Sequence, residues 1–169
     1  MAETLDDALH DEAPASAQRV LTLACSHDLK IATAESCTGG LLAALLTDIP
    51  NCSHAFERGF VVYSPVAKSE LLSISPERID RFGVVSKEIA VDMALGALTA
   101  SHADVALSVT GFAGPGAPGD EEGLVHLACA RRNYPTEHCE EHFGPIGRAG
   151  VRRATIDVAL QMLERAVQH

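Results

Sequence analysis

The stretch that most constrains the fold is residues 33–40, TAESCTGG, because it joins two apolar segments of different kinds. A short apolar run at residues 29–32 precedes it, and an apolar helical stretch at residues 41–46 follows it. This order predicts a strand, a tight turn and a helix whose first backbone N–H groups are unpaired. Such a helix start suits an anion or a developing oxyanion, and Gly39 and Gly40 allow the backbone to come close to a ligand.

Two side chains in this turn, Ser36 and Cys37, are candidate nucleophiles. Ser36 can either cap the following helix or attack a substrate, and on its own it favours the cap. Cys37 is the rival nucleophile, because a thiol at a helix N-terminus would have a lowered pKa. A catalytic cysteine usually works with a histidine, and none of the eight histidines has a spacing that commits it to that role. We therefore favour Ser36 as the nucleophile.

Short apolar runs alternate with helical stretches along the chain. Strands are expected at residues 29–34, 59–63, 104–109, 123–130 and 137–143. Helices are expected at residues 15–28, 40–46, 67–72 and 86–98, from Ser75 onward, and at residues 148–167. The alternation predicts a single layered α/β/α domain with a central mixed sheet flanked by helices. We expect residues 1–14 to be a flexible acidic leader and residues 15–169 to form the domain.

Composition narrows the class of protein further. The 169 residues fit one domain, and 47% of them are apolar, which is enough for a substantial core. A formal net charge of -10 argues against nucleic acid as a partner, because phosphate contacts need Lys and Arg. The apolar runs are too short to span a membrane, and residues 1–14 lack the features of a signal peptide. Five cysteines without paired zinc-type spacing indicate reduced thiols, so we expect a cytoplasmic protein.

Four segments are expected to meet at one site, because α/β folds bind ligands where strands end. They are residues 35–40, 63–68, 110–116 and 148–153. Lys68 can act as the base for a serine if its surroundings lower its pKa. Its spacing alone, however, favours a solvated surface charge beside Glu70. Tyr63 is either a half-buried edge aromatic or a site residue, and Thr110 either shapes a turn or lines the site.

Two late clusters are also candidates for binding. His138, Cys139 and His142 offer metal-ligand atoms, although on a strand the two histidines would share one face and Cys139 would point away. We favour a protein without a bound metal. Arg148, Arg152 and Arg153 lie near a helix start, where cations oppose the helix dipole, and a bound phosphate would explain that placement.

The motifs together resemble the CinA C-terminal domain family. The resemblance rests on residues 34–40 (AESCTGG), on residues 59–64 (GFVVYS) followed by Lys68, on residues 83–90 (GVVSKEIA), and most specifically on residues 103–116 (ADVALSVTGFAGPG). It runs from about Arg19 to Leu163, and the motifs keep the family's order.

The resemblance implies an amidase that converts nicotinamide mononucleotide and water to nicotinate mononucleotide and ammonia, without a cofactor. It implies that Ser36 is the nucleophile, that Lys68 is its base, and that Tyr63 orients the lysine or assists proton transfer. The residues expected to bind this nucleotide are Thr38, Gly39, Gly40, Thr110, Gly111, Gly114, Arg148 and Arg152. A homo-oligomer is expected, since the Ala-rich helices leave surface for a symmetric interface. The alternative is a nucleotide-binding or interaction module without turnover, in which Ser36 is only a cap.

Overall fold

One five-stranded sheet forms the centre of the protein in this computed structural model, which describes residues 12–168 apart from the side chain of Ser53. The strand order is β2-β1-β3-β4-β5. The first three of these pair in parallel, whereas β4 is antiparallel to both of its neighbours, so the sheet is mixed. The strands are β1 (Ile31–Glu35), β2 (Phe56–Val61), β3 (Val105–Gly111), β4 (Leu124–Arg131) and β5 (Glu137–His142).

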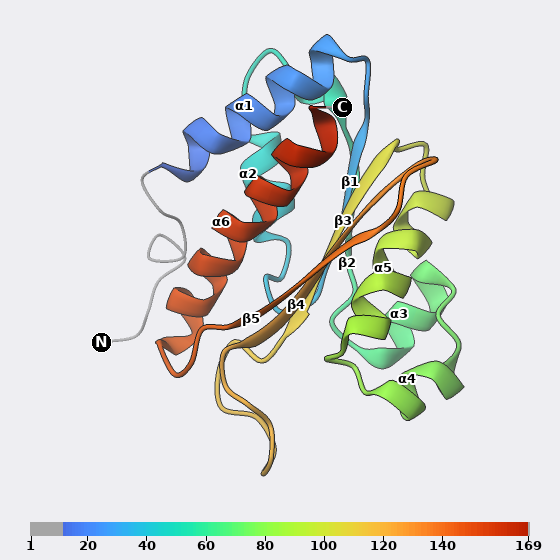
Figure 1. Cartoon of the computed structure of the whole chain (residues 1–169), viewed down its shortest axis with the longest axis vertical. Helices are drawn as coiled ribbons and strands as arrows, with labels where there is room; N and C mark the ends of the chain where they lie inside the picture. Colours follow the sequence, from blue (N-terminus) through green and yellow to red (C-terminus); the bar gives the residue numbers. More distant parts are fainter. Residues whose placement is uncertain (1–11, 169) are drawn as a thin grey trace.

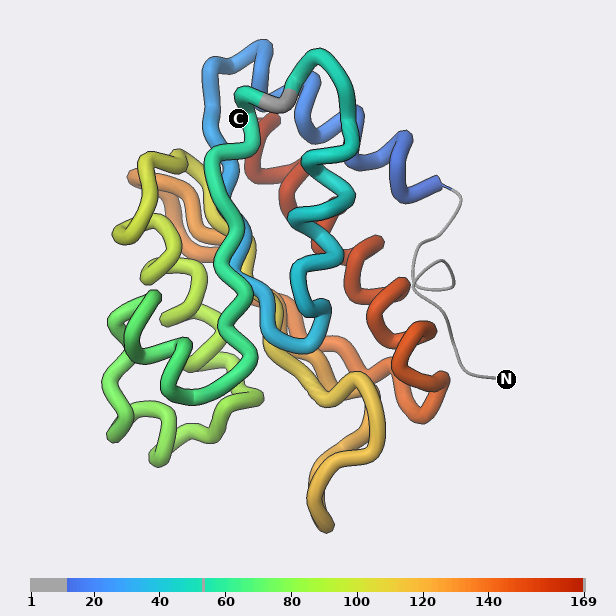
Figure 2. The backbone as a smooth tube through the Cα atoms, turned by 180° about the vertical axis from the view of Figure 1, so that it is seen from behind, coloured from blue at the N-terminus to red at the C-terminus, as the bar shows by residue number. Residues whose placement is uncertain are grey.

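Helices cover both faces of this sheet (Figure 1, Figure 2). One face carries α1 (Ala13–Ser26), α2 (Leu41–Thr47) and α6 (Gly147–Val167), and the other carries α3 (Pro65–Leu72), α4 (Pro76–Phe82) and α5 (Lys87–Thr99). A short 3-10 helix, η2 (Ser53–Ala55), precedes β2. Each face has its own buried apolar cluster. The predicted α/β/α layering is therefore confirmed.

Serine caps explain where three helices begin. The side chains of Ser64, Ser75 and Ser86 accept hydrogen bonds from backbone N–H groups in the first turns of α3, α4 and α5. Each cap of this kind contributes about 1 kcal/mol to stability. Since α3 starts directly after β2, its cap also fixes how the chain turns from the edge strand back toward the site.

Most predicted boundaries lie within two residues of the observed ones, and two of the differences affect the description of the site and the domain. Helix α1 begins at Ala13, so Ala13 and Pro14 belong to the folded domain and not to the leader; residues 1–11 lie outside the described residues. Strand β2 runs over Phe56–Val61 rather than 59–63, because its polar first half pairs with β1. Tyr63 consequently lies beyond the strand.

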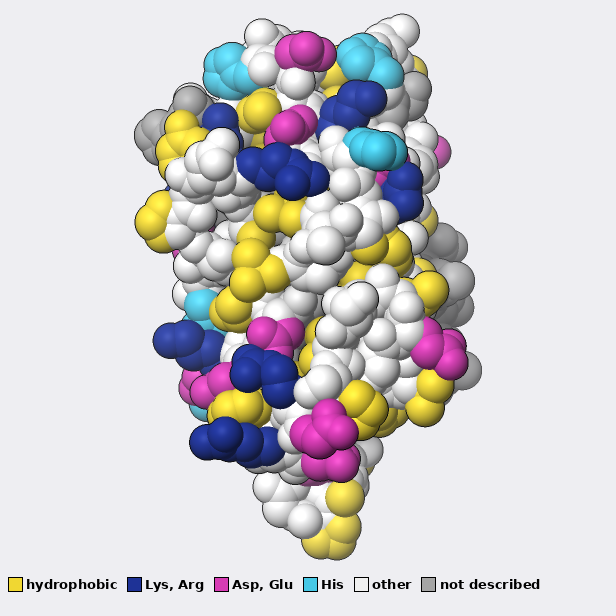
Figure 3. Space-filling model, turned by 90° about the vertical axis from the view of Figure 1, so that its right-hand side faces the viewer, with side chains coloured by type: hydrophobic (Ala, Val, Ile, Leu, Met, Phe, Trp, Pro, Cys, Tyr) yellow, Lys and Arg dark blue, Asp and Glu magenta, His cyan; other side chains and the backbone are white. Residues whose placement is uncertain are grey.

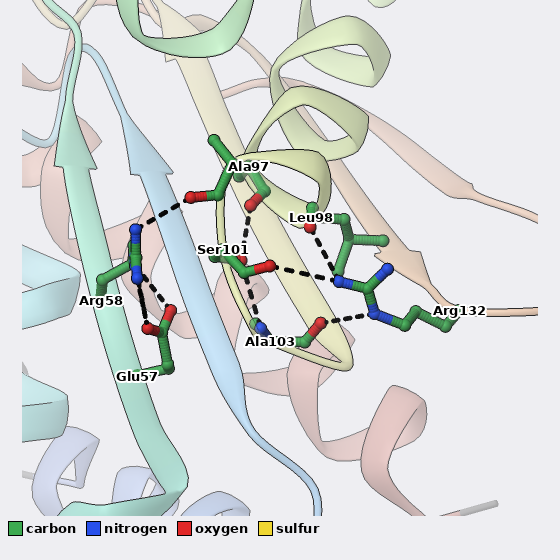
Figure 4. Close-up of polar contacts among 8 residues, drawn as sticks. Glu57, Arg58, Ala97, Leu98, Ser101, Ala103 and Arg132 are labelled. Atoms are coloured by element: carbon green, nitrogen blue, oxygen red, sulfur yellow. Dashed lines mark hydrogen bonds and ion pairs between the residues drawn. The ribbon is translucent and has the colours of Figure 1, made fainter.

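Arginine side chains close the end of the sheet opposite the predicted site (Figure 4). Arg132 donates hydrogen bonds to the carbonyls of Leu98 and Ala103, each at 2.9 Å. Arg58, from the edge strand β2, donates to the Ala100 carbonyl at 2.9 Å. These contacts satisfy carbonyls at the C-terminal end of α5, where the helix dipole favours a cation.

Charges of both signs are interspersed with small apolar areas on the face seen in Figure 3. Within the part of the chain that the structure describes, no helix has the length and apolarity that crossing a bilayer requires.

Candidate active site

Ser36 and Lys68 meet directly where β1 ends. Ser36 follows the last residue of β1. Lys68 lies in α3, the helix that follows the edge strand β2. The Lys68 Nζ donates to the Ser36 Oγ at 3.1 Å and to the Val62 carbonyl at 2.8 Å. Only 1% of the Lys68 surface is exposed, so the interpretation of this residue as a solvated surface charge is wrong. The side chain instead runs inward and presents its amine to the serine hydroxyl.

Burial makes this amine easy to deprotonate. Removal from water lowers the pKa of Lys68 to about 8, and the nearby Cys37 opposes this only in part. Among the described residues, no carboxylate lies within ion-pair distance of the Lys68 Nζ. A substantial fraction of the lysine is therefore neutral near pH 8, and a neutral amine can accept a proton from Ser36.

Cys37 has the opposite character. It is 4% exposed, and burial raises the pKa of its thiol to about 12. The predicted lowering of this pKa is wrong, because the side chain is buried in the core and not exposed at a helix start. The arrangement favours Ser36 as the nucleophile.

The carboxylate of Glu35 explains why the start of α2 is not free for an anion. Its oxygens accept hydrogen bonds from the N–H groups of Gly40 (3.1 Å), Leu42 (3.1 Å) and Ala43 (2.8 Å). The residue that caps α2 by position is Gly40, so the interpretation of Ser36 as the helix cap is wrong. Sequence reasoning missed this role of Glu35. The available signal was a carboxylate placed just before a helix that has no acidic residue in its own first turn.

The turn between Ser36 and α2 depends on its two glycines. Gly39 and Gly40 have φ angles of +63° and +94°, a conformation that side chains disfavour. In the described residues, no other residue accepts a hydrogen bond from the N–H groups of Cys37 or Thr38, whereas those of Ser36, Gly39 and the first residues of α2 are paired. Of these two residues, Cys37 follows Ser36 directly and lines the cavity described next, so its N–H group is the candidate oxyanion donor.

A cavity of about 310 Å³ opens over this pair. Thr110 lines it and donates from Oγ1 to the Val84 carbonyl at 2.7 Å, which ties the end of β3 to the segment before α5. The loop after β3 forms one wall, and Gly111 and Gly114 belong to it. The structure therefore brings Ser36, Lys68, Thr110 and this loop together as predicted.

Arg148 reaches the same cavity from the first turn of α6. It packs against Gly114, where an added Cβ would lie 3.1 Å from the Arg148 Nη2, so the glycine lets the guanidinium lie close to the loop. The start of α6 has no acidic residue in its first turn and no side-chain cap. Arg148 and this helix start together form a positively polarised wall.

Several predicted site residues lie elsewhere. Thr38, Gly39, Gly40 and Arg152 do not line the cavity. Arg152 donates from Nε to the Cys37 carbonyl at 2.9 Å, so it supports the Ser36 turn from behind. Tyr63 does line the cavity, but it is 66% exposed, and in the described residues no hydrogen bond joins it to Lys68. Val62, rather than Tyr63, orients the lysine.

The predicted trio of His138, Cys139 and His142 is not assembled as a ligand set. Cys139 points to the opposite face of β5, where it packs against the α6-side core, as the strand pattern predicted. In the described part of the chain, the group whose ligand atoms converge is His126, His138 and Glu140. Sequence reasoning missed His126 because it joins the others only through the pairing of β4 with β5.

Comparison with known proteins places the whole domain. A sequence model of the CinA C-terminal domain matches residues 14–167. A CinA-like protein of Akkermansia muciniphila is 43% identical over 153 residues, which cover 88% of this chain and 37% of that protein. The chain spans about a third of the length of the curated relatives it matches.

Solved structures agree with these sequence matches. The competence/damage inducible protein CihA from Agrobacterium tumefaciens superposes with a TM-score of 0.90 at 41% identity, with all of both chains covered. The competence damage-inducible protein A from Klebsiella pneumoniae gives a TM-score of 0.87 at 30% identity, with 93% of this chain and 98% of that chain covered.

Proposed function

The chain belongs to the CinA C-terminal domain family, and on this premise we propose that it is an amidase acting on nicotinamide mononucleotide. The products would be nicotinate mononucleotide and ammonia. The observation that carries the proposal is the 3.1 Å hydrogen bond between the buried Lys68 Nζ and the Ser36 Oγ. A serine paired with a lysine of lowered pKa is a nucleophile with its base.

The reaction starts with neutral Lys68. As the Ser36 Oγ attacks the carboxamide carbon, its proton passes to the Lys68 Nζ, and the carbonyl oxygen becomes an oxyanion. The Cys37 N–H group would donate to it, and one such donor is worth about 3–4 kcal/mol of barrier. The Lys68 ammonium then protonates the departing nitrogen, which leaves as ammonia.

Deacylation uses the same two residues in reverse. Lys68, again neutral, takes a proton from water as the water oxygen attacks the acyl carbon. The tetrahedral intermediate collapses, the bond to the Ser36 Oγ breaks, and Lys68 returns its proton to that oxygen. Nicotinate mononucleotide is released, and no metal or organic cofactor takes part in these steps.

The wall that contains Arg148 suits the phosphate of the nucleotide. With the carboxamide at Ser36, a phosphate at the other side of the cavity would meet the Arg148 guanidinium. A charge-assisted hydrogen bond of this kind is worth roughly 1.5–3 kcal/mol, or about ten- to a hundred-fold in binding. Arg148→Ala should therefore raise KM for nicotinamide mononucleotide and change kcat little. Nicotinamide riboside, which lacks the phosphate, should be handled almost equally by parent and variant.

The deciding experiment measures ammonia release from nicotinamide mononucleotide by the purified full chain. Turnover that disappears in Ser36→Ala supports the proposal. Binding of the nucleotide without ammonia release, in parent and variant alike, would favour the binding-module alternative, whose Ser36 has no chemical role.

A further inference from the structure

A second cluster of chemically capable side chains lies on the α5-side face of the sheet, outside the Ser36 cavity. In the register of the sheet, His126 on β4 stands between Thr110 on β3 and Glu140 on β5. One row along, His138 stands beside Ala128, whose side chain faces the α5-side core. Since paired residues share a face, the pairing of β4 with β5 directs both imidazoles and one carboxylate to the same point.

The ligand atoms are separated by distances that a single metal ion can bridge. The His126 Nδ1 is 3.1 Å from the His138 Nε2 and 3.7 Å from a Glu140 oxygen, and one ligand atom from each residue lies within 4.8 Å of the others. Two zinc–nitrogen bonds of about 2.0–2.1 Å at a tetrahedral angle place their nitrogens about 3.4 Å apart. The separation between the two imidazole nitrogens is therefore already close to the one that a shared zinc ion requires.

Both imidazoles of the cluster are at least partly removed from water. Burial lowers the pKa of His126 and also that of His138, and in His138 the neighbouring His126 lowers the pKa further. Glu140 opposes this in both rings, as does Glu88 from the first turn of α5, while Lys87 acts on His138 in the other direction.

A partner outside the cluster fixes the carboxylate. The second oxygen of Glu140 lies 3.0 Å from the His142 Nε2, and the His142 Nδ1 lies 2.6 Å from Glu121. The hydrogen bond with Glu121 raises the pKa of His142 most, and the hydrogen bond with Glu140 raises it further. His142 thus holds Glu140 by one oxygen and leaves the other directed at His126, which is how outer partners orient metal-binding carboxylates.

We propose that His126, His138 and Glu140 form a binding site for one divalent transition-metal ion of the zinc class, with water completing the coordination. Two imidazoles and a carboxylate suit zinc, whereas magnesium and calcium prefer oxygen ligands alone. The ion would join β4 to β5 next to the strand that carries Thr110. None of its three ligand residues lines the Ser36 cavity, so its occupancy should stabilise the fold and leave the amidase chemistry unchanged. The site stands independently of the proposed function.

The test is calorimetric titration of the chelator-treated full chain with Zn²⁺. The parent should bind one equivalent and gain thermal stability. His126→Ala and His138→Gln each remove a proposed ligand and should weaken zinc binding by at least about 100-fold. His142→Ala removes only the partner that orients Glu140 and should weaken binding by about ten-fold. His102→Ala, an exposed histidine outside the cluster, serves as the matched control and should bind as the parent does.

A simple hydrogen bond between two neutral rings also accounts for the 3.1 Å contact, and the titration separates the two interpretations. No stoichiometric binding by the parent would overturn the metal site. So would binding that His138→Gln leaves unchanged, since this half-buried position tolerates glutamine without loss of the fold. Imidazole ¹⁵N shifts of His126 and His138 on addition of Zn²⁺ to the parent provide a readout that does not depend on the variants folding.

Discussion

Lys68 and Arg132 are both cations that donate to backbone carbonyls, yet their surroundings treat the charge in opposite ways. Arg132 lies at the exposed end of α5, where several carbonyls and the helix dipole stabilise a positive charge. Lys68 is buried and donates to one carbonyl and one hydroxyl, whereas the carboxylate of Glu35 accepts hydrogen bonds from the first N–H groups of α2. A hydrogen bond from a cationic side chain to a backbone carbonyl therefore stabilises the end of α5 at Arg132, whereas at Lys68 it accompanies a lysine whose pKa is lowered.

The largest effect is expected when Ser36, the hydroxyl that neutral Lys68 would deprotonate, is removed. Ser36→Ala should reduce ammonia release by at least about 10⁴-fold, as loss of a nucleophile typically does. Cys37→Ala should keep most of the activity, because burial holds that thiol protonated. Steady-state ammonia assays on both variants check this. The reverse pattern would move the chemistry to a thiolate.

Changing the base tests whether its neutral form matters. Lys68→Arg should lose about 10²- to 10⁴-fold in kcat, the usual contribution of a general base, because a guanidinium stays protonated. In the parent, kcat/KM should rise with pH and level off above about 8, as Lys68 loses its proton. A pH–rate profile measures this. A fully active Lys68→Arg enzyme would rule the role out.

The lowered pKa of Lys68 should also affect how the free energy of unfolding depends on pH. Between about pH 8 and the ordinary lysine pKa of 10.5, the unfolded chain binds a proton at Lys68 that the folded chain does not, so Lys68 adds stability as pH rises in this window. The thiols of Cys25, Cys37, Cys129 and Cys139, whose pKa values are raised, act in the opposite direction. The gain from Lys68 is about 3 kcal/mol for a shift of this size. Urea unfolding across the window should show it as a stability of the parent that rises with pH relative to that of Lys68→Met, since the cysteines contribute equally to both proteins. Lys30→Met, at an exposed lysine, is the control that should keep it. An identical pH dependence in Lys68→Met would mean that the lysine titrates normally.

The smallest effect is expected at the other cation. Arg132→Ala should cost about 1–2 kcal/mol of unfolding free energy, because it leaves carbonyls at the end of α5 to solvent. Turnover per folded molecule should stay at the parent level, since the side chain is at the far end of the sheet. Chemical denaturation beside an ammonia assay tests both halves. Loss of kcat in the folded variant would contradict the separation of the two ends.

Much of this architecture could be predicted from sequence because it is encoded locally. Serine followed by proline or by a charged helix start marks α3, α4 and α5, and apolar runs mark the inner strands. Strand β2 was harder, since its first half is polar and its pairing with β1 decides where it begins.

The site divides along the same line. Ser36 and the glycine turn could be located from one continuous motif, whereas the burial of Lys68 depends on how α3 packs against the sheet, which spacing within a helix does not reveal. Arg152 shows the converse: its position near a helix start predicted a ligand contact, and the fold uses it on the Cys37 carbonyl instead. His126 could not be grouped with Glu140 until the register of β4 and β5 was known.

The exposed ring of Tyr63 at the cavity mouth has a spectroscopic consequence. The chain contains two tyrosines and no tryptophan, so its near-ultraviolet emission comes from these two phenols. Tyr134 lies apart from the cavity, with the Arg131 guanidinium 4.5 Å from its ring centre. A molecule that enters the cavity therefore changes the surroundings of one emitter and leaves the other as a constant reference. The protein thus carries its own fluorescent reporter of occupancy.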